Sequence, residues 1–165
     1  MLILLPPSEK KSQTDKPTPA MSVYVGVLYQ ALDWSSLSPA AKKRGETAIA
    51  IISAKYGALR PLDPIEPYKE KINNELMRPI VGATLNSVST DLIIDCRSST
   101  YQTVWPSPIE KTVEIKVFTK VDGEKNQQRP FQRRNGADVD DAVHFHNAID
   151  GEQRRAAKDE QSCQD

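Results

Sequence analysis

The side chains best suited to binding chemistry lie in three polar segments, and each segment follows a short apolar run. The first contains Ser8, Glu9 and Lys11, directly after the apolar residues 2–5 and two prolines. A strand followed by a loop with lysine and serine is a common arrangement for phosphate binding. The glycines of a P-loop are missing, so a solvated, charged surface loop is the competing interpretation.

The second segment, residues 53–69, is rich in cations and phenols. It contains Lys55, Tyr56, Arg60, Tyr68 and Lys69. Lysine and arginine can contact phosphates, and tyrosine rings can stack on bases. The same stretch contains three prolines, so the alternative is a rigid connection whose tyrosine rings pack on the core.

The third segment follows the apolar run at 91–96. Its polar side chains are Asp95, Arg97, Ser98 and Tyr101. Asp95 and Arg97 are two positions apart and can share one face of an extended chain, either in a binding site or as a structural ion pair. Cys96 is an unconvincing nucleophile, because His144 and His146 lie far away in the polar C-terminal region and offer no paired base.

Composition limits the remaining classes of function. The chain of 165 residues has 22 basic and 22 acidic side chains, which argues against binding polyanions with the whole surface but allows a local basic patch. Cys96 and Cys163 form no CxxC or Cys/His motif, so neither a disulfide framework nor a metal site is predicted, and no cofactor is implied. The apolar start is too short for a signal peptide and no stretch is long enough to span a membrane, which predicts a cytoplasmic protein.

The elements that must position these segments form an α/β, or mixed α+β, fold. Buried strands are expected near 2–5, 48–54 and 91–96, because these runs are apolar on both faces. An alternating pattern predicts an edge strand near 112–120.

Helices are expected to flank this sheet. Ser38-Pro39 predicts a helix over 39–46, and a weak helical pattern over 70–85 is expected to break at Pro79. If the three buried strands are parallel, their polar segments leave the same edge of the sheet. Lys11, Lys55, Arg60 and Arg97 would then gather in one basic site.

The chain changes character after Gly123. Residues 1–123 are expected to form one domain, whereas 124–165 contain few large apolar side chains and are predicted to be a disordered or non-native tail. Asp122-Gly123 is suited to a hairpin turn, yet no returning strand is predicted from the polar residues that follow.

Four blocks of sequence, taken together and in order, resemble the YaaA family of bacterial peroxide-stress proteins over roughly residues 1–123. The blocks are MLILLPPSE at 1–9, VYVGVLYQALD at 23–33, SAKYGALRP at 53–61 with PYK at 67–69, and DCRSSTY at 95–101. The resemblance implies a cytoplasmic protein that limits damage from hydrogen peroxide, connected with iron homeostasis and DNA. It also implies DNA binding through a basic cleft in a mixed α/β fold with a helix-hairpin-helix-like element.

The chain departs from the family pattern in three places. The segments between the first two blocks and between Tyr68 and Asp91 are short, and a polar run replaces the closing basic helix. We hypothesise that the tail after Gly123 is a frameshifted or degenerate reading.

The leading functional hypothesis is noncatalytic DNA binding. The cations that would contact phosphates are Lys11, Lys55, Arg60, Lys69 and Arg97. The rings that would stack on bases are Tyr56 and Tyr68. The neighbouring polar groups that would support them are Ser8, Glu9, Asp95, Ser98 and Tyr101. A second hypothesis is an enzyme or small-ligand binder for a phosphorylated metabolite or nucleotide, with Asp95 as acid/base and Lys11 or Arg60 as phosphate clamps. A third is a truncated relative without function. The sequence predicts no particular oligomeric state.

Overall fold

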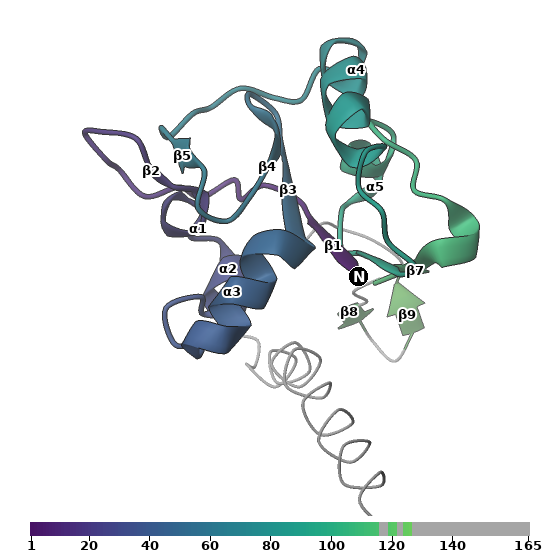
Figure 1. Cartoon of the computed structure of the whole chain (residues 1–165), viewed down its shortest axis with the longest axis horizontal. Helices are drawn as coiled ribbons and strands as arrows, with labels where there is room; N and C mark the ends of the chain where they lie inside the picture. The colour runs from purple at the N-terminus through teal and green to yellow at the C-terminus, as the bar shows by residue number, and fades with distance from the viewer. Residues whose placement is uncertain (116–118, 122–123, 127–165) are drawn as a thin grey trace, which may run out of the picture.

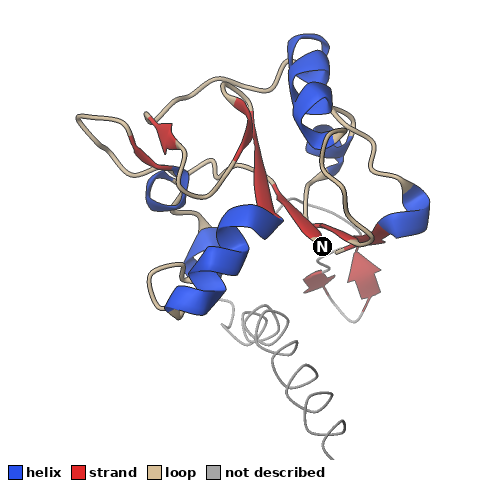
Figure 2. Cartoon of the chain, viewed as in Figure 1, coloured by secondary structure: helices blue, strands red, loops and turns tan. Residues whose placement is uncertain are grey.

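The computed structural model describes residues 1–115, 119–121 and 124–126. Its strands are β1 (Leu2–Leu5), β2 (Thr18–Pro19), β3 (Ile49–Ser53), β4 (Gly57–Leu59), β5 (Pro64–Ile65), β6 (Ile93–Asp95), β7 (Thr112–Glu114), β8 (Thr119–Val121) and β9 (Glu124–Asn126). Its helices are α1 (Ala20–Val23), α2 (Val27–Leu32), α3 (Pro39–Ala48), α4 (Asn74–Leu85) and α5 (Ser99–Gln102), with a 3₁₀ turn at Ile109–Lys111. Figures 1 and 2 show these elements around a central sheet.

The central sheet is mixed and has the strand order β4-β3-β1-β6-β7. Strand β1 is parallel to β3 and to β6, and β6 is parallel to β7. Only β4 is antiparallel, because the chain turns back directly after β3. The predicted α/β class is therefore confirmed, and β1, β3 and β6 run parallel, which is the condition for their loops to share one edge.

The sheet is covered on both faces, as strands that are apolar on both sides require. Ile3, Leu5 and Ile51 face a cluster that includes α1 and α2, whereas Leu2 and Leu4 face one that includes α4. In Figure 1, α1–α3 lie on one side of the strands and α4 and α5 on the other. This two-layer cover leaves the strand ends as the places where polar loops emerge.

The starts of α3 and α4 follow local capping chemistry, whereas one predicted break does not occur. The Ser38 hydroxyl accepts from the Ala41 backbone N–H before Pro39 begins α3, as predicted. Asn73 caps α4 in the same way. The expected break at Pro79 is wrong, because α4 continues through it to Leu85. Packing of Met77, Val81 and Leu85 in the core outweighs the lost hydrogen bond.

The predicted edge strand is present but shorter than expected. Strand β7 covers Thr112–Glu114, and Val113 and Ile115 remain 52% and 40% exposed. The absence of a returning strand after Gly123 was a wrong prediction, because β9 pairs antiparallel with β8. Such pairing joins backbone groups and does not require an apolar segment. The rest of the predicted disordered tail, residues 127–165, lies outside the described residues.

Candidate anion-binding site

The first polar loop folds back against the start of α2. The Ser8 hydroxyl donates to the carbonyl of Lys10 at 2.6 Å, and Gly26 lies so close to Ser8 that a Cβ atom there would collide with its hydroxyl. Lys11 then forms an isolated antiparallel bridge with Tyr24. The loop is therefore held against residues 24–26, which brings Lys11 to a defined position.

A buried chain of three hydroxyl groups joins the first loop to the second. The hydroxyls of Tyr24 and Tyr68 are 2.8 Å apart, and the Ser53 hydroxyl donates to Tyr68 at 2.8 Å. Ser53, Tyr24 and Tyr68 are 0%, 1% and 7% exposed. Ser53 also accepts from the backbone N–H groups of Lys55 and Tyr56, so the network holds the turn after β3 in place.

Lys11 lies over this tyrosine cluster. Its amine is 4.2 Å from the centroid of the Tyr68 ring and 5.8 Å from that of Tyr24, within the range of cation–π attraction. Burial lowers the pKa of the Lys11 amine, while the charges of Glu70 and Glu9 act in the opposite direction. The result is a half-buried cation on a rigid aromatic surface.

The second loop adds exposed charges beside Lys11. Lys55 lies 5.2 Å from the Tyr56 ring centroid and 3.8 Å from the carboxylate of Glu70. The Tyr56 ring contacts Tyr68 edge-on, with centroids 5.7 Å apart. Lys69 is exposed and directly follows Tyr68. The exposed Lys55–Glu70 pair is long and solvated, so it contributes little to stability and can open.

Asp95 and Arg97 of the third loop form the structural ion pair that was one of the two expectations. The Arg97 guanidinium donates to both carboxylate oxygens of Asp95, at 2.9 and 2.7 Å, and also to the carbonyls of Tyr101 and Trp105. Asp95 and Arg97 are 2% and 3% exposed. The Arg97 guanidinium therefore hydrogen-bonds to groups of this chain beneath the end of β6, and it does not lie beside Lys11.

Other groups of the third loop do approach the tyrosine cluster. Burial raises the pKa of Tyr101 to about 12, with smaller contributions from nearby Tyr68 and Glu9. Cys96 packs against the same core, and burial raises the pKa of its thiol to about 12. A thiol of that pKa is a poor nucleophile at neutral pH. Ser98 is half-buried and precedes α5.

Arg60 is a second predicted site residue that the fold places away from Lys11. Because β4 is antiparallel, the chain has returned toward the amino end of β3 when it reaches Arg60. There the guanidinium donates to the carbonyls of Thr47 and Ile49, at 2.8 and 3.0 Å. The expected cluster of four cations is therefore reduced to Lys11 and Lys55, with Lys69 nearby in sequence.

Sequence reasoning missed two members of the site, Tyr24 and Ser53. Tyr24 belongs to a motif that carried the family resemblance, and Ser53 ends a buried strand, so each had a signal that went unused. Within the described part of the chain, no three His, Cys, Asp or Glu side chains are grouped as metal ligands. His144 and His146 lie outside the described residues. None of the helices described here is long and apolar enough to cross a membrane.

Comparison with known proteins identifies the family. The family model described as peroxide stress protein YaaA matches residues 9–135, which is most of the chain and includes Lys11 and the second and third loops of the site. The chain therefore belongs to this family of peroxide-stress proteins. The match continues beyond Gly123, where the sequence suggested that the domain ends.

Curated relatives named UPF0246 proteins match the chain over part of their own length. A UPF0246 protein of Streptomyces coelicolor is 32% identical over 97 residues, covering 53% of this chain and 37% of the relative. A UPF0246 protein of Roseobacter denitrificans is 28% identical over 116 residues, which cover 61% of this chain and 44% of the relative. One of Corynebacterium efficiens is 37% identical over 109 residues, covering 59% and 43%. The chain thus spans less than half the length of these relatives.

Proposed function

We propose that this chain protects the cell during peroxide stress by binding DNA, without catalysis, at the carboxyl edge of its parallel sheet. The observation that carries the proposal is the placement of Lys11 and Lys55. They lie on loops that leave adjacent parallel strands, and Lys11 is seated on the Tyr24–Tyr68 surface. Family membership supports the peroxide-stress part of the proposal.

The charges at this edge suit a phosphate backbone. Lys11 is the central cation, and the exposed Lys55 and Lys69 can contact neighbouring phosphates. Glu70 competes for Lys55 across 3.8 Å, and an arriving phosphate can replace it because the pair is exposed. Tyr56 is half-buried and is the ring placed for base stacking, whereas Tyr68 is enclosed by other tyrosines.

A titration of the full chain with labelled single-stranded and duplex DNA tests the proposal. Affinity should be measurable at about 50 mM salt and fall steeply at about 200 mM, because bound phosphates release counterions. Lys11→Met should weaken binding and reduce the salt dependence. Lys111→Met is the matched control, since Lys111 precedes β7 at the opposite, amino edge of the sheet.

Two results would contradict DNA binding at this edge. One is the absence of affinity at low salt, or affinity that does not respond to salt. The other is equal weakening by Lys11→Met and Lys111→Met, which would place binding elsewhere or make it nonspecific.

A second function, binding of a phosphorylated metabolite or nucleotide, is favoured by one feature of the same site. Lys11 is half-buried beside a hydroxyl network. Such an enclosed cation suits a small anion better than it suits the extended backbone of DNA. A thermal-shift screen with nucleotides and sugar phosphates distinguishes the two, because a ligand bound by the folded state raises the Tm. A rise that Lys11→Met abolishes, in a chain without DNA affinity, would support the second function.

A further inference from the structure

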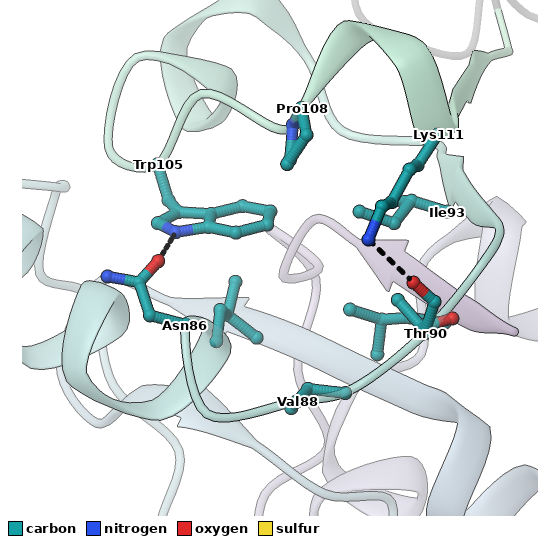
Figure 3. Close-up of a pocket in the computed structure, with 9 residues that line it drawn as sticks. Asn86, Val88, Thr90, Ile93, Trp105, Pro108 and Lys111 are labelled. Atoms are coloured by element: carbon teal, nitrogen blue, oxygen red, sulfur yellow. Dashed lines mark hydrogen bonds between the residues drawn. The ribbon is translucent and has the colours of Figure 1, made fainter.

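A hollow lies at the amino edge of the sheet, opposite the Lys11 site, where β1 and β6 begin. Its volume is about 210 Å³, and its lining comes from three places in the sequence. The floor is formed by Leu2, Leu85 and Ile93, which are almost fully buried, with Val88 beside them. Figure 3 shows the Trp105 indole and Pro108 forming the opposite wall.

The aromatic wall is fixed from two directions. The Trp105 indole N–H donates to the Asn86 side-chain oxygen at 2.8 Å. Its backbone carbonyl accepts from Arg97 at 2.9 Å, so the buried Asp95–Arg97 pair supports it from behind. Because the indole is already held in place, binding a ligand on its flat face does not carry the entropic cost of ordering this side chain.

One cation stands across the hollow from this wall. The Lys111 amine points inward and donates to the carbonyl of Thr90 at 3.3 Å (Figure 3). Among the described residues no carboxylate lies within ion-pair distance of it. An ammonium has three N–H donors, so two remain for a ligand. The hollow therefore combines an apolar floor, a flat aromatic wall and a positive charge that has no carboxylate partner among the described residues.

The dimensions limit what fits. An engineered apolar cavity of about 150 Å³ holds a benzene molecule. A hollow of about 210 Å³ can hold a single aromatic ring with a small substituent, but it is below the usual size of nucleotide or drug-sized sites. The charge of Lys111 makes that substituent an anion, and a planar carboxylate continues the plane of the ring.

We propose that this hollow binds a small aromatic carboxylate, with the ring between Trp105 and the aliphatic floor and the carboxylate on Lys111. This site is independent of the carboxyl-edge site, and the proposal does not depend on DNA binding. The family match does not assign it.

Nuclear magnetic resonance of the full chain, with benzoate as the probe, tests the proposal. The sequence contains two tryptophans, Trp34 and Trp105, so their indole N–H signals serve as an internal control and a reporter. Benzoate should shift the Trp105 signal saturably and leave that of Trp34 in place. Benzamide, which is neutral and of similar shape, should bind at least about fivefold more weakly.

Two variants locate the interaction. Lys111→Met should reduce benzoate affinity to that of benzamide, whereas Lys11→Met should not change it. Val88→Phe, which fills the hollow, should abolish the shift for both probes. If Lys111→Met does not fold, the wild-type chain still tests the proposal, because added salt should weaken the binding of benzoate and leave the binding of benzamide unchanged. No saturable shift of Trp105, equal affinity for the two probes, or benzoate binding insensitive to Lys111 and salt would overturn the proposal.

Discussion

At the scale of single residues, partners decide the role of each charged group. Arg97 and Lys11 are both cations that follow buried strands, yet only Lys11 faces the loop surface. The Arg97 guanidinium is enclosed by the Asp95 carboxylate and two backbone carbonyls. Its neighbour Asp95 sits at the end of β6 and pairs in register with Glu114 of β7. Stability rather than binding is therefore the expected consequence of changing Arg97.

We predict that Arg97→Met lowers the free energy of unfolding by about 3–5 kcal/mol. The substitution leaves the Asp95 carboxylate buried without its counter-charge, which is costly. Urea unfolding of the variant and of wild type measures the effect. The double variant Asp95→Asn, Arg97→Met should recover part of the loss, because it removes both charges. A loss below about 1 kcal/mol for the single variant would show that the pair is not structural.

At the scale of elements, helix α4 tolerates a residue that usually ends a helix. Pro79 lacks the N–H that would bond to the Glu75 carbonyl, and its ring crowds that carbonyl. We predict that Pro79→Ala raises the free energy of unfolding by about 1–2 kcal/mol. This is less than the difference in helix propensity between proline and alanine, because alanine also gives the unfolded chain more conformational entropy.

Denaturant unfolding with circular dichroism measures this change. Pro17→Ala is the matched control, because Pro17 is exposed and outside every described helix, and it should be neutral or slightly destabilising. Destabilisation by Pro79→Ala would contradict this prediction and would mean that the proline ring itself supports the packing of α4.

At the scale of the whole molecule, several weak acids are buried around one edge of the sheet. Burial raises the pKa of Tyr101 and of Cys96 to about 12, and it raises the pKa values of Tyr24 and Tyr29 as well. In the unfolded chain these groups lose their protons near pH 10 for tyrosine and about 8.5 for cysteine. The folded chain therefore binds more protons than the unfolded chain in the alkaline range.

We predict that the protein loses stability as the pH rises from about 9 to 12. The contribution of these groups is fully present below their unfolded pKa values and is lost as the pH approaches the folded values, at no more than about 1.4 kcal/mol per group for each pH unit and at less for the partly exposed Tyr101. Urea midpoints measured between pH 7 and 11 test this. In the Cys96→Ala variant, the urea midpoint relative to that variant's own value at pH 7 should fall less steeply in the first part of this pH range. A midpoint constant up to pH 11 would contradict the burial of these phenols.

The sequence by itself determined the class of fold, the three buried strands and the family. These depend on local signals: runs that are apolar on both faces are typical of central strands, and blocks of adjacent residues carry the resemblance. The convergence of the loops from β1 and β3 also followed, because parallel neighbours end at one edge.

Tertiary structure alone decided which cations share a site. Arg60 left the predicted cluster because β4 runs antiparallel and returns it to the other edge, and Arg97 left it because Asp95 and two carbonyls enclose it. Tyr24 and Ser53 joined because they meet Tyr68 across 44 and 15 residues of chain. The hollow beside Trp105 arose in the same way, from residues 2, 86 and 111. Charge and residue type are local properties, whereas the partner that satisfies a charge depends on how distant segments pack.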